Sequence, residues 1–111
     1  LANEDDAYIS VPEKNEKDYI LKVVSGVYEH LPEIDSYIEK YAVGWKFNRI
    51  SRVALAILRV CMFEIIYMPD IPEKAAINEA VELAKRYEDE DIPPFVNGVL
   101  GSFSRAEGIR E

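Results

Sequence analysis

The chain has 111 residues, a length that suits one domain. Hydrophobic residues make up 49% of it, which is enough for a core and too many for a disordered chain. The formal net charge of −8 repels phosphate at long range, so a nucleic-acid role needs a local basic patch, further residues or a basic partner. The single cysteine, Cys61, excludes an internal disulfide and is typical of a buried side chain in a reducing compartment such as the cytoplasm. No apolar run approaches the roughly 18 residues of a membrane span.

Residues 1–14 are polar and acidic, which predicts an extended lead-in. Helical spacing of apolar residues begins after Asn15, a candidate N-cap that acids follow in the first turn. His30 ends this first helix, and we expect it to satisfy carbonyl groups there, since no second histidine exists to join it as a ligand. Pro32 suits the first turn of a second helix, which Gly44 ends.

Trp45 follows that glycine, and we expect it to anchor the core at the helix junction, with base stacking as the alternative. Residues 50–68 form the most apolar segment. Because they are apolar nearly all round, they predict a central helix with neighbours on several sides. Arg59 and Glu64 interrupt this segment. Buried charges need partners, so we expect both in an ion-pair or hydrogen-bond network.

The next predicted helix covers about residues 76–87 and begins after a proline-containing turn. The acidic run at residues 88–91 predicts a solvated connection. Pro93 starts the last helix. Within that helix, Gly98 is expected to permit close helix approach despite a propensity cost of roughly 1 kcal/mol.

No strand pattern or internal repeat competes with these helices. The fold class is therefore predicted to be all-α, a bundle of about five helices with short connections. Its expected parts are the lead-in 1–14, a helical domain 15–105 and a frayed tail 106–111. One histidine and one cysteine on different helices, without a metal or phosphate-loop motif, indicate no enzyme and no metal site.

Three segments carry a resemblance to a known family. ALAILRVCMFEIIYM (residues 54–68), DIPEKAAINEAVELAKRY (70–87) and FVNGVL (95–100) closely resemble the transcription antitermination factor NusB, and a weaker match covers residues 15–49. The resemblance implies an all-α fold of two small subdomains of the three-helix type. It also implies an RNA-binding protein of processive antitermination, notably on ribosomal RNA operons, with no catalysis and no cofactor.

The resemblance also implies partners. NusB-like proteins pair with NusE, a small-subunit ribosomal protein, recognise the boxA element in nascent RNA and help load it onto the RNA polymerase elongation complex. Residues 1–14 match only the region before the family's third helix, so its opening arginine-rich helix and the following helix are expected to be absent here. Core surface would then be exposed, and a homo-oligomer would cover it.

The family places RNA contacts at the start of the last helix, which implies RNA contacts at Asp91 and Phe95. Phe95 is expected to stack on a base or ribose; the alternative is a core residue at the helix start. Pro94 stands where many relatives carry a basic residue, which weakens a phosphate contact. Tyr41 or Lys40, at the end of the second predicted helix, are further RNA candidates.

The resemblance also implies a retained part of the NusE surface, at Asn48, Arg49, Ser51 and Ala54. Three polar motif residues are expected to be structural, because they can accept backbone N–H bonds at helix starts or pair with Arg59: Asn78, Glu79 and Asn97. Two other functions stay open. One is the recognition domain of a ribosomal RNA cytosine methyltransferase, and the other is a protein-only interaction module, which the acidic charge favours.

Overall fold

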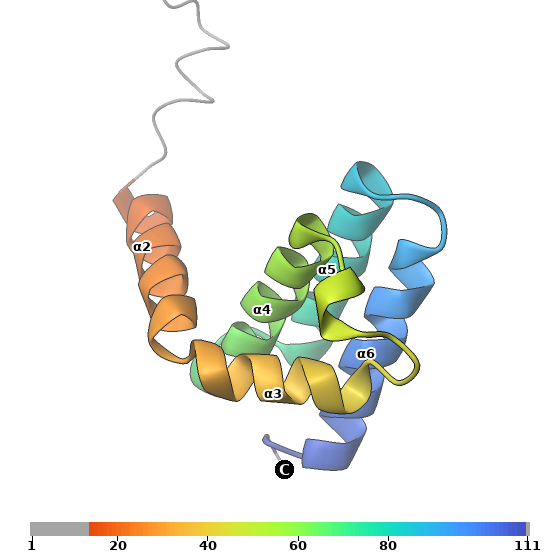
Figure 1. The fold of residues 1–111 in the computed structure, drawn as a ribbon. Helices are drawn as coiled ribbons and strands as arrows, with labels where there is room; N and C mark the ends of the chain where they lie inside the picture. The colour runs from red at the N-terminus through yellow and green to blue at the C-terminus, as the bar shows by residue number, and fades with distance from the viewer. Residues whose placement is uncertain (1–13, 111) are drawn as a thin grey trace, which may run out of the picture.

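The computed structural model describes residues 14–110, and it places five α-helices in this range (Figure 1). They are α2 (Lys14–Glu29), α3 (Leu31–Tyr41), α4 (Arg52–Tyr67), α5 (Glu73–Tyr87) and α6 (Ile92–Glu107), with a short 3₁₀ helix, η1 (Phe47–Arg49), before α4. The described residues contain no strand, so the all-α prediction is confirmed. No helix among them is long and apolar enough to cross a bilayer.

Helix α4 lies at the centre of the fold, as its apolar sequence predicted. It contacts α2, α3, α5 and α6, while α5 and α6 also pack against each other and α3 lies against α6 (Figure 1). Ser51 is its N-cap, and the Ser51 hydroxyl oxygen accepts a hydrogen bond from the backbone N–H of Ala54 at 3.1 Å. A helix with partners on several sides can bury apolar residues around most of its circumference.

The core lies between α3, α4 and α6, with small residues of α5 completing it. Its largest fully buried side chains are Phe103, Ile34, Ile38, Leu58, Met62, Ile65, Leu100, Val96 and Cys61. On α3 and α6 these positions recur at three- and four-residue spacing, which sets one apolar stripe on each helix. Burial raises the pKa of the Cys61 thiol, which agrees with a packing role for this residue.

Prolines mark the helix starts. Pro32 and Pro93 lie in the first turns of α3 and α6, as predicted. Helix α5 begins at Glu73, earlier than expected, because Pro72 already serves as its N-cap. Helix α2 begins at Lys14, so Asn15 lies in its first turn and is not the N-cap.

Close helix approach occurs at Gly26 and not at Gly98. A Cβ atom at Gly26 would overlap the ring of Phe63, so α2 reaches α4 only because this residue has no side chain. A Cβ atom at Gly98 would meet no atom within 4 Å. The prediction that Gly98 permits close helix packing is therefore wrong.

Two of the charged residues of α4, Arg59 and Glu64, have partners, but not each other. Arg59 forms a bidentate ion pair with Asp35 of α3, with nitrogen–oxygen distances of 2.8 and 2.9 Å. Glu64 is buried and accepts a hydrogen bond from the Tyr19 hydroxyl of α2. The predicted polar network is thus present. The expected pairing of Arg59 with Glu79 is absent, because the Arg59 guanidinium faces Asp35 of α3.

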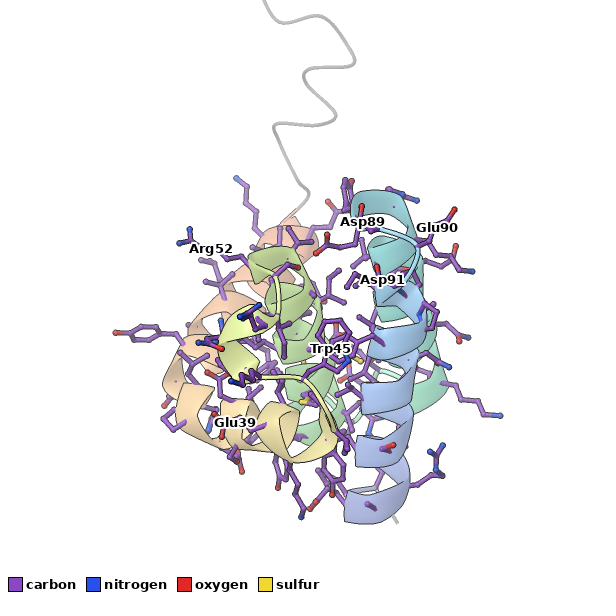
Figure 2. All side chains as sticks on the ribbon, turned by 45° about the vertical axis from the view of Figure 1, so that its right-hand side comes forward. Glu39, Trp45, Arg52, Asp89, Glu90 and Asp91 are labelled. Atoms are coloured by element: carbon purple, nitrogen blue, oxygen red, sulfur yellow. The ribbon has the colours of Figure 1, made fainter. Side chains whose placement is uncertain are left out.

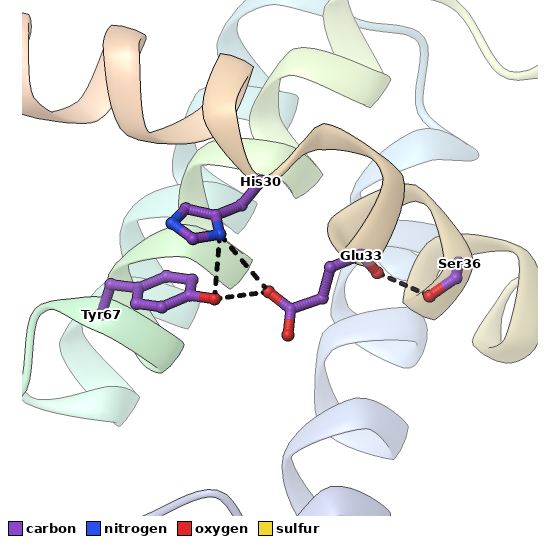
Figure 3. A network of polar contacts seen from close by, with 4 residues as sticks. All are labelled: His30, Glu33, Ser36 and Tyr67. Carbon is purple, nitrogen blue, oxygen red and sulfur yellow. Dashed lines mark hydrogen bonds and ion pairs between the residues drawn. The ribbon is translucent and has the colours of Figure 1, made fainter.

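His30 joins three helices instead of capping carbonyl groups (Figure 3). Its ring stacks on that of Tyr67 with centroids 4.2 Å apart, and its Nδ1 lies 3.1 Å from the Tyr67 hydroxyl. That hydroxyl donates to Glu33 at 2.6 Å, so its single hydrogen is used and Nδ1 must be the donor to it. The Glu33 hydrogen bond raises the pKa of Tyr67 to about 12.

The tail after α6 is docked against α4 as far as residue 110. Gly108 caps α6 in a left-handed conformation, with φ of 53°. The Arg110 guanidinium then donates to carbonyl oxygens at the end of α4 and in the following turn, those of Glu64, Ile65, Met68 and Ile71. Carbonyl groups at a helix end lack partners within the helix, which explains why this tail is held where fraying was expected.

Candidate nucleic-acid interface

A hollow of about 260 Å³ opens between the end of α3, the loop that follows it and α6. We call it the aromatic hollow and define it by its lining residues: Tyr41, Ala42, Val43, Trp45, Pro94, Phe95, Gly98, Val99 and Ser102. None of these side chains carries a charge. In a chain with a net charge of −8, such a surface repels an anionic ligand less than its surroundings do.

The turn after α3 brings Trp45 against α6. Gly44 takes the left-handed conformation with φ of 84°, which an L side chain rarely adopts. The backbone N–H of Trp45 then donates to the carbonyl of Ala42 at 3.1 Å. The chain reverses here, and Trp45 lies beside α6 (Figure 2). Its ring centroid is 4.5 Å from that of Phe95, with the two planes tilted by 40°.

Trp45 does not anchor the core, and that prediction is wrong. Its side chain is 40% exposed. The fully buried ring between α3 and α6 is that of Phe103, against which Tyr37 and Tyr41 pack edge-on at centroid distances of 5.0 and 6.1 Å. The indole lies against Phe95 in the wall of the hollow, where the alternative of base stacking stays open.

Tyr41 and Lys40, both predicted as RNA contacts, meet on one carboxylate. The Lys40 Nζ lies 2.9 Å from Glu107 Oε2, and the Tyr41 hydroxyl donates to the same oxygen. The hydrogen bond from Tyr41, with that from Lys40, lowers the pKa of Glu107, and the pKa of Lys40 is raised in return. The ring of Tyr41 lines the hollow while its hydroxyl is occupied by Glu107.

Phe95 and Asp91 are one helical turn apart at the start of α6. Phe95 is half-buried and forms one wall of the hollow, so it combines the two roles considered for it. Asp91 is exposed beside Asp89 and Glu90 in the preceding loop and is not part of the lining (Figure 2). A carboxylate here can accept hydrogen bonds from a base or a 2′-hydroxyl, but it repels phosphate.

The four residues proposed for the protein partner differ in accessibility. Asn48 and Arg49 are exposed on η1. Ser51 is exposed too, although its hydroxyl donates to Glu88 and caps α4. Ala54 is completely buried in the core, so it cannot touch a partner, and its assignment to this surface is wrong.

The motif residues expected to pin helix starts lie on the surface. Asn78, Glu79 and Asn97 are all exposed. Helix α5 begins at Glu73, so the first two of these residues lie in its second turn, beyond the reach of its N-cap. These residues belong to the motifs that resemble the family, but the prediction that they pin helix starts is wrong.

Three other hollows contain carboxylates, unlike the aromatic hollow. One of about 240 Å³, between α2, α4 and α5, is lined in part by Glu64 and Glu79. A second includes Glu29, and a third includes Glu88 and Glu90. Across residues 14–110, no three His, Cys, Asp or Glu side chains are grouped so that they could hold a metal ion.

For two residues that line the hollow, the sequence favoured a different role. Trp45 was assigned to the core and Gly98 to helix packing, because spacing alone does not show which side of a helix junction is already filled. The available signals were a tryptophan directly after a turn glycine, and a glycine in the middle of a helix three residues after an aromatic side chain.

Comparison with known proteins gives consistent results. The model of the NusB family matches residues 1–105. The transcription antitermination protein NusB of Ruminiclostridium cellulolyticum is 50% identical over 94 residues, which cover 85% of this chain and 65% of that protein. The protein of the same name from Alkaliphilus oremlandii is 52% identical over 97 residues, covering 87% and 70%. The chain thus spans about two thirds of the length of these relatives.

Solved structures agree with this assignment. The structure of T. maritima NusB superposes with a TM-score of 0.80 at 36% identity, covering 85% of this chain and 66% of that one. A second structure, described as the crystal structure of a plectonemic RNA supercoil, gives a TM-score of 0.83 at 30% identity over 97% of this chain and 79% of that one. The relatives are named as antitermination proteins and not as enzymes. The chain belongs to the NusB family.

Proposed function

We propose that this chain acts in transcription antitermination, by binding boxA-type RNA together with NusE in the RNA polymerase elongation complex. The observation that carries this proposal is the identity of about one half to NusB relatives over most of the chain. The RNA named in the description of a similar structure supports the RNA part of it. Such a factor works where nascent RNA is made, in the bacterial cytoplasm.

The aromatic hollow is the RNA contact in this proposal. The exposed ring of Trp45 and the half-buried ring of Phe95 lie together in the wall of this hollow, and single-stranded RNA is recognised largely through stacking of unpaired bases on aromatic rings. The net charge of −8 leaves little positive charge for phosphates, so we assign most of the phosphate contacts to the protein partner. Asn48 and Arg49 on η1 are the accessible residues proposed to meet that partner.

The test is a three-component binding experiment at moderate salt. The chain is mixed with NusE and a boxA RNA, and the affinity of the ternary complex is compared with that of the chain and RNA without NusE. A tighter ternary complex that a scrambled RNA does not form is expected. If no such complex forms, the proposal fails. If the chain binds NusE without adding affinity for RNA, the protein-only module replaces it.

Phe95→Ala tests the site within this function. Loss of one stacked base is expected to weaken the ternary complex by about 1–3 kcal/mol, or roughly five- to 150-fold. Tyr87→Ala is the matched control, because this exposed aromatic residue lies outside the aromatic hollow. Urea titrations of both variants show whether the fold is kept. Equal affinities of the two variants would remove Phe95 from the RNA site.

A further inference from the structure

Gly98 is a helix-interior residue whose lack of a side chain has no packing reason. A glycine inside a helix costs roughly 1 kcal/mol relative to alanine. Such a residue is normally required by a positive φ or by a close neighbour. Among the described residues only Gly44 and Gly108 have positive φ, and a Cβ atom at Gly98 would meet nothing within 4 Å.

The space next to Gly98 belongs to the aromatic hollow. Gly98 lies in its lining, three residues after Phe95 and four before Ser102, so the three residues share one face of α6. A side chain at position 98 would extend into the hollow, since open space surrounds its Cβ position. The missing side chain therefore keeps room beside the paired rings of Trp45 and Phe95.

The chemistry of the walls indicates what this room admits. Apart from Ser102 the walls are apolar or aromatic, and they carry no carboxylate, whereas the three other hollows described above each contain at least one. Lys40, beside the lining residue Tyr41, is paired with Glu107 at 2.9 Å, and the exposed Lys46 follows Trp45 in the chain. Uncharged walls that contain aromatic rings fit the face of another aromatic ring, such as an RNA base.

We propose that Gly98 is kept without a side chain so that the aromatic hollow admits one unpaired RNA base, which lies against Trp45 and Phe95. This inference rests on the proposed function and names the occupant of its site. Gly98 and Trp45 are specificity-determining residues under this proposal. They select single-stranded over duplex RNA, because a paired and stacked base has no free face to offer.

Trp45 provides the measurement, because it is the one tryptophan of the chain. The chain is titrated with a short single-stranded RNA of mixed sequence, and separately with the same RNA annealed to its complement, while tryptophan fluorescence is recorded. The single strand is expected to change the emission and the duplex to leave it unchanged. A fluorescence response to the duplex equal to that of the single strand would contradict a stacked unpaired base.

Gly98→Leu fills the hollow, and Gly101→Ala is its control on the same helix. A Cβ atom at Gly101 meets only the flexible end of Arg105, at 3.1 Å, and this residue lies outside the lining. Binding is measured with labelled RNA, with and without NusE. Gly98→Leu and Trp45→Ala are each expected to weaken RNA binding about tenfold, while Gly101→Ala leaves it unchanged. Thermal unfolding confirms that each variant is folded, and Gly98→Ala, which favours the helix, serves if the leucine variant is not.

The outcomes separate this inference from the proposed function. If the parent chain forms the ternary complex and Gly98→Leu, Gly98→Ala and Trp45→Ala bind RNA equally well, the inference is overturned and the proposed function stands. If Gly98→Leu weakens NusE binding without RNA, the hollow holds a protein and the inference is again overturned. If the parent chain forms no RNA complex, both fail.

Discussion

Helices α2 and α6 have the same length of 16 residues and both are amphipathic, yet they are used in opposite ways. Helix α6 buries most of its apolar stripe, and Val96, Leu100 and Phe103 are completely buried. Helix α2 buries Val23, but leaves Leu21 67% and Tyr28 81% exposed. Amphipathic spacing thus predicts a helix and its apolar face, while the neighbouring elements decide whether that face is covered.

Helix α2 contributes Val23 to the core and is otherwise attached by a few specific contacts. Gly26 allows it to lie against Phe63, and Tyr19 donates a hydrogen bond to Glu64. At its end, His30 stacks on Tyr67 (Figure 3). In Figure 1, α2 accordingly stands at the edge of the molecule. The exposed apolar face agrees with the expectation of uncovered core surface, and an oligomer that covers it stays a prediction.

The largest expected effect separates the two helices directly. Phe103→Ala removes a fully buried ring and should lower the free energy of unfolding by about 3–5 kcal/mol. Leu21→Ala removes a side chain of similar size from the exposed face of α2 and should change it by less than about 0.5 kcal/mol. Urea unfolding followed by circular dichroism measures both. A large loss in Leu21→Ala would mean that this face is covered in solution.

Gly26→Ala addresses the attachment of α2. The added methyl group overlaps the Phe63 ring, and the required shift should cost about 1–3 kcal/mol. Gly98→Ala is the matched change in α6, and it should stabilise the protein by up to about 1 kcal/mol, because it meets no neighbour. Hydrogen exchange should show lost protection in α2 for the first variant alone. Unaltered protection there would show that the contact with Phe63 does not hold α2.

The smallest expected effect is a pH dependence at the link between α2 and α4. Burial, and to a lesser degree the charge of Glu79, raises the pKa of Glu64 above its ordinary 4.5, although the hydrogen bond from Tyr19 opposes this. The folded chain therefore holds this proton more tightly than the unfolded chain. The contribution of Glu64 to stability is greatest below pH 4.5 and falls as pH rises through the raised pKa.

Glu64→Gln should remove this decline, because its amide oxygen still accepts the Tyr19 hydrogen bond without carrying a charge. At neutral pH the variant should unfold at a slightly higher urea concentration than the parent. Glu82→Gln, at an exposed site on α5, controls for the loss of one negative charge. Urea midpoints measured from below pH 4.5 to neutral pH decide the matter. Equal declines in parent and variant would assign the pH dependence to other groups.

Much of the fold followed from local chemistry. Prolines at helix starts, the turn at Gly44 and the nearly uniform apolar segment of α4 predicted the helices and the central one among them. The site was predicted less completely. Phe95 and Tyr41 do line one hollow, but Asp91 and Lys40 lie outside its lining, and Ala54 is buried away from any partner. The spacing of apolar residues shows which face of a helix is buried, but it does not show how the faces of two helices are placed relative to each other.

The order of residues determined the five helices, the apolar stripe on each and, through AINEAVELAK and FVNGVL, the family. The tertiary structure decided which partner each special residue has. Arg59 pairs with Asp35 because α3 crosses α4 at that point. Trp45 packs against Phe95 in the wall of the hollow and is not buried in the core. Gly26 and Gly98 are both glycines inside helices. Packing places the ring of Phe63 against Gly26, so no side chain fits there, whereas it places no atom close to the Cβ position of Gly98, which leaves open space.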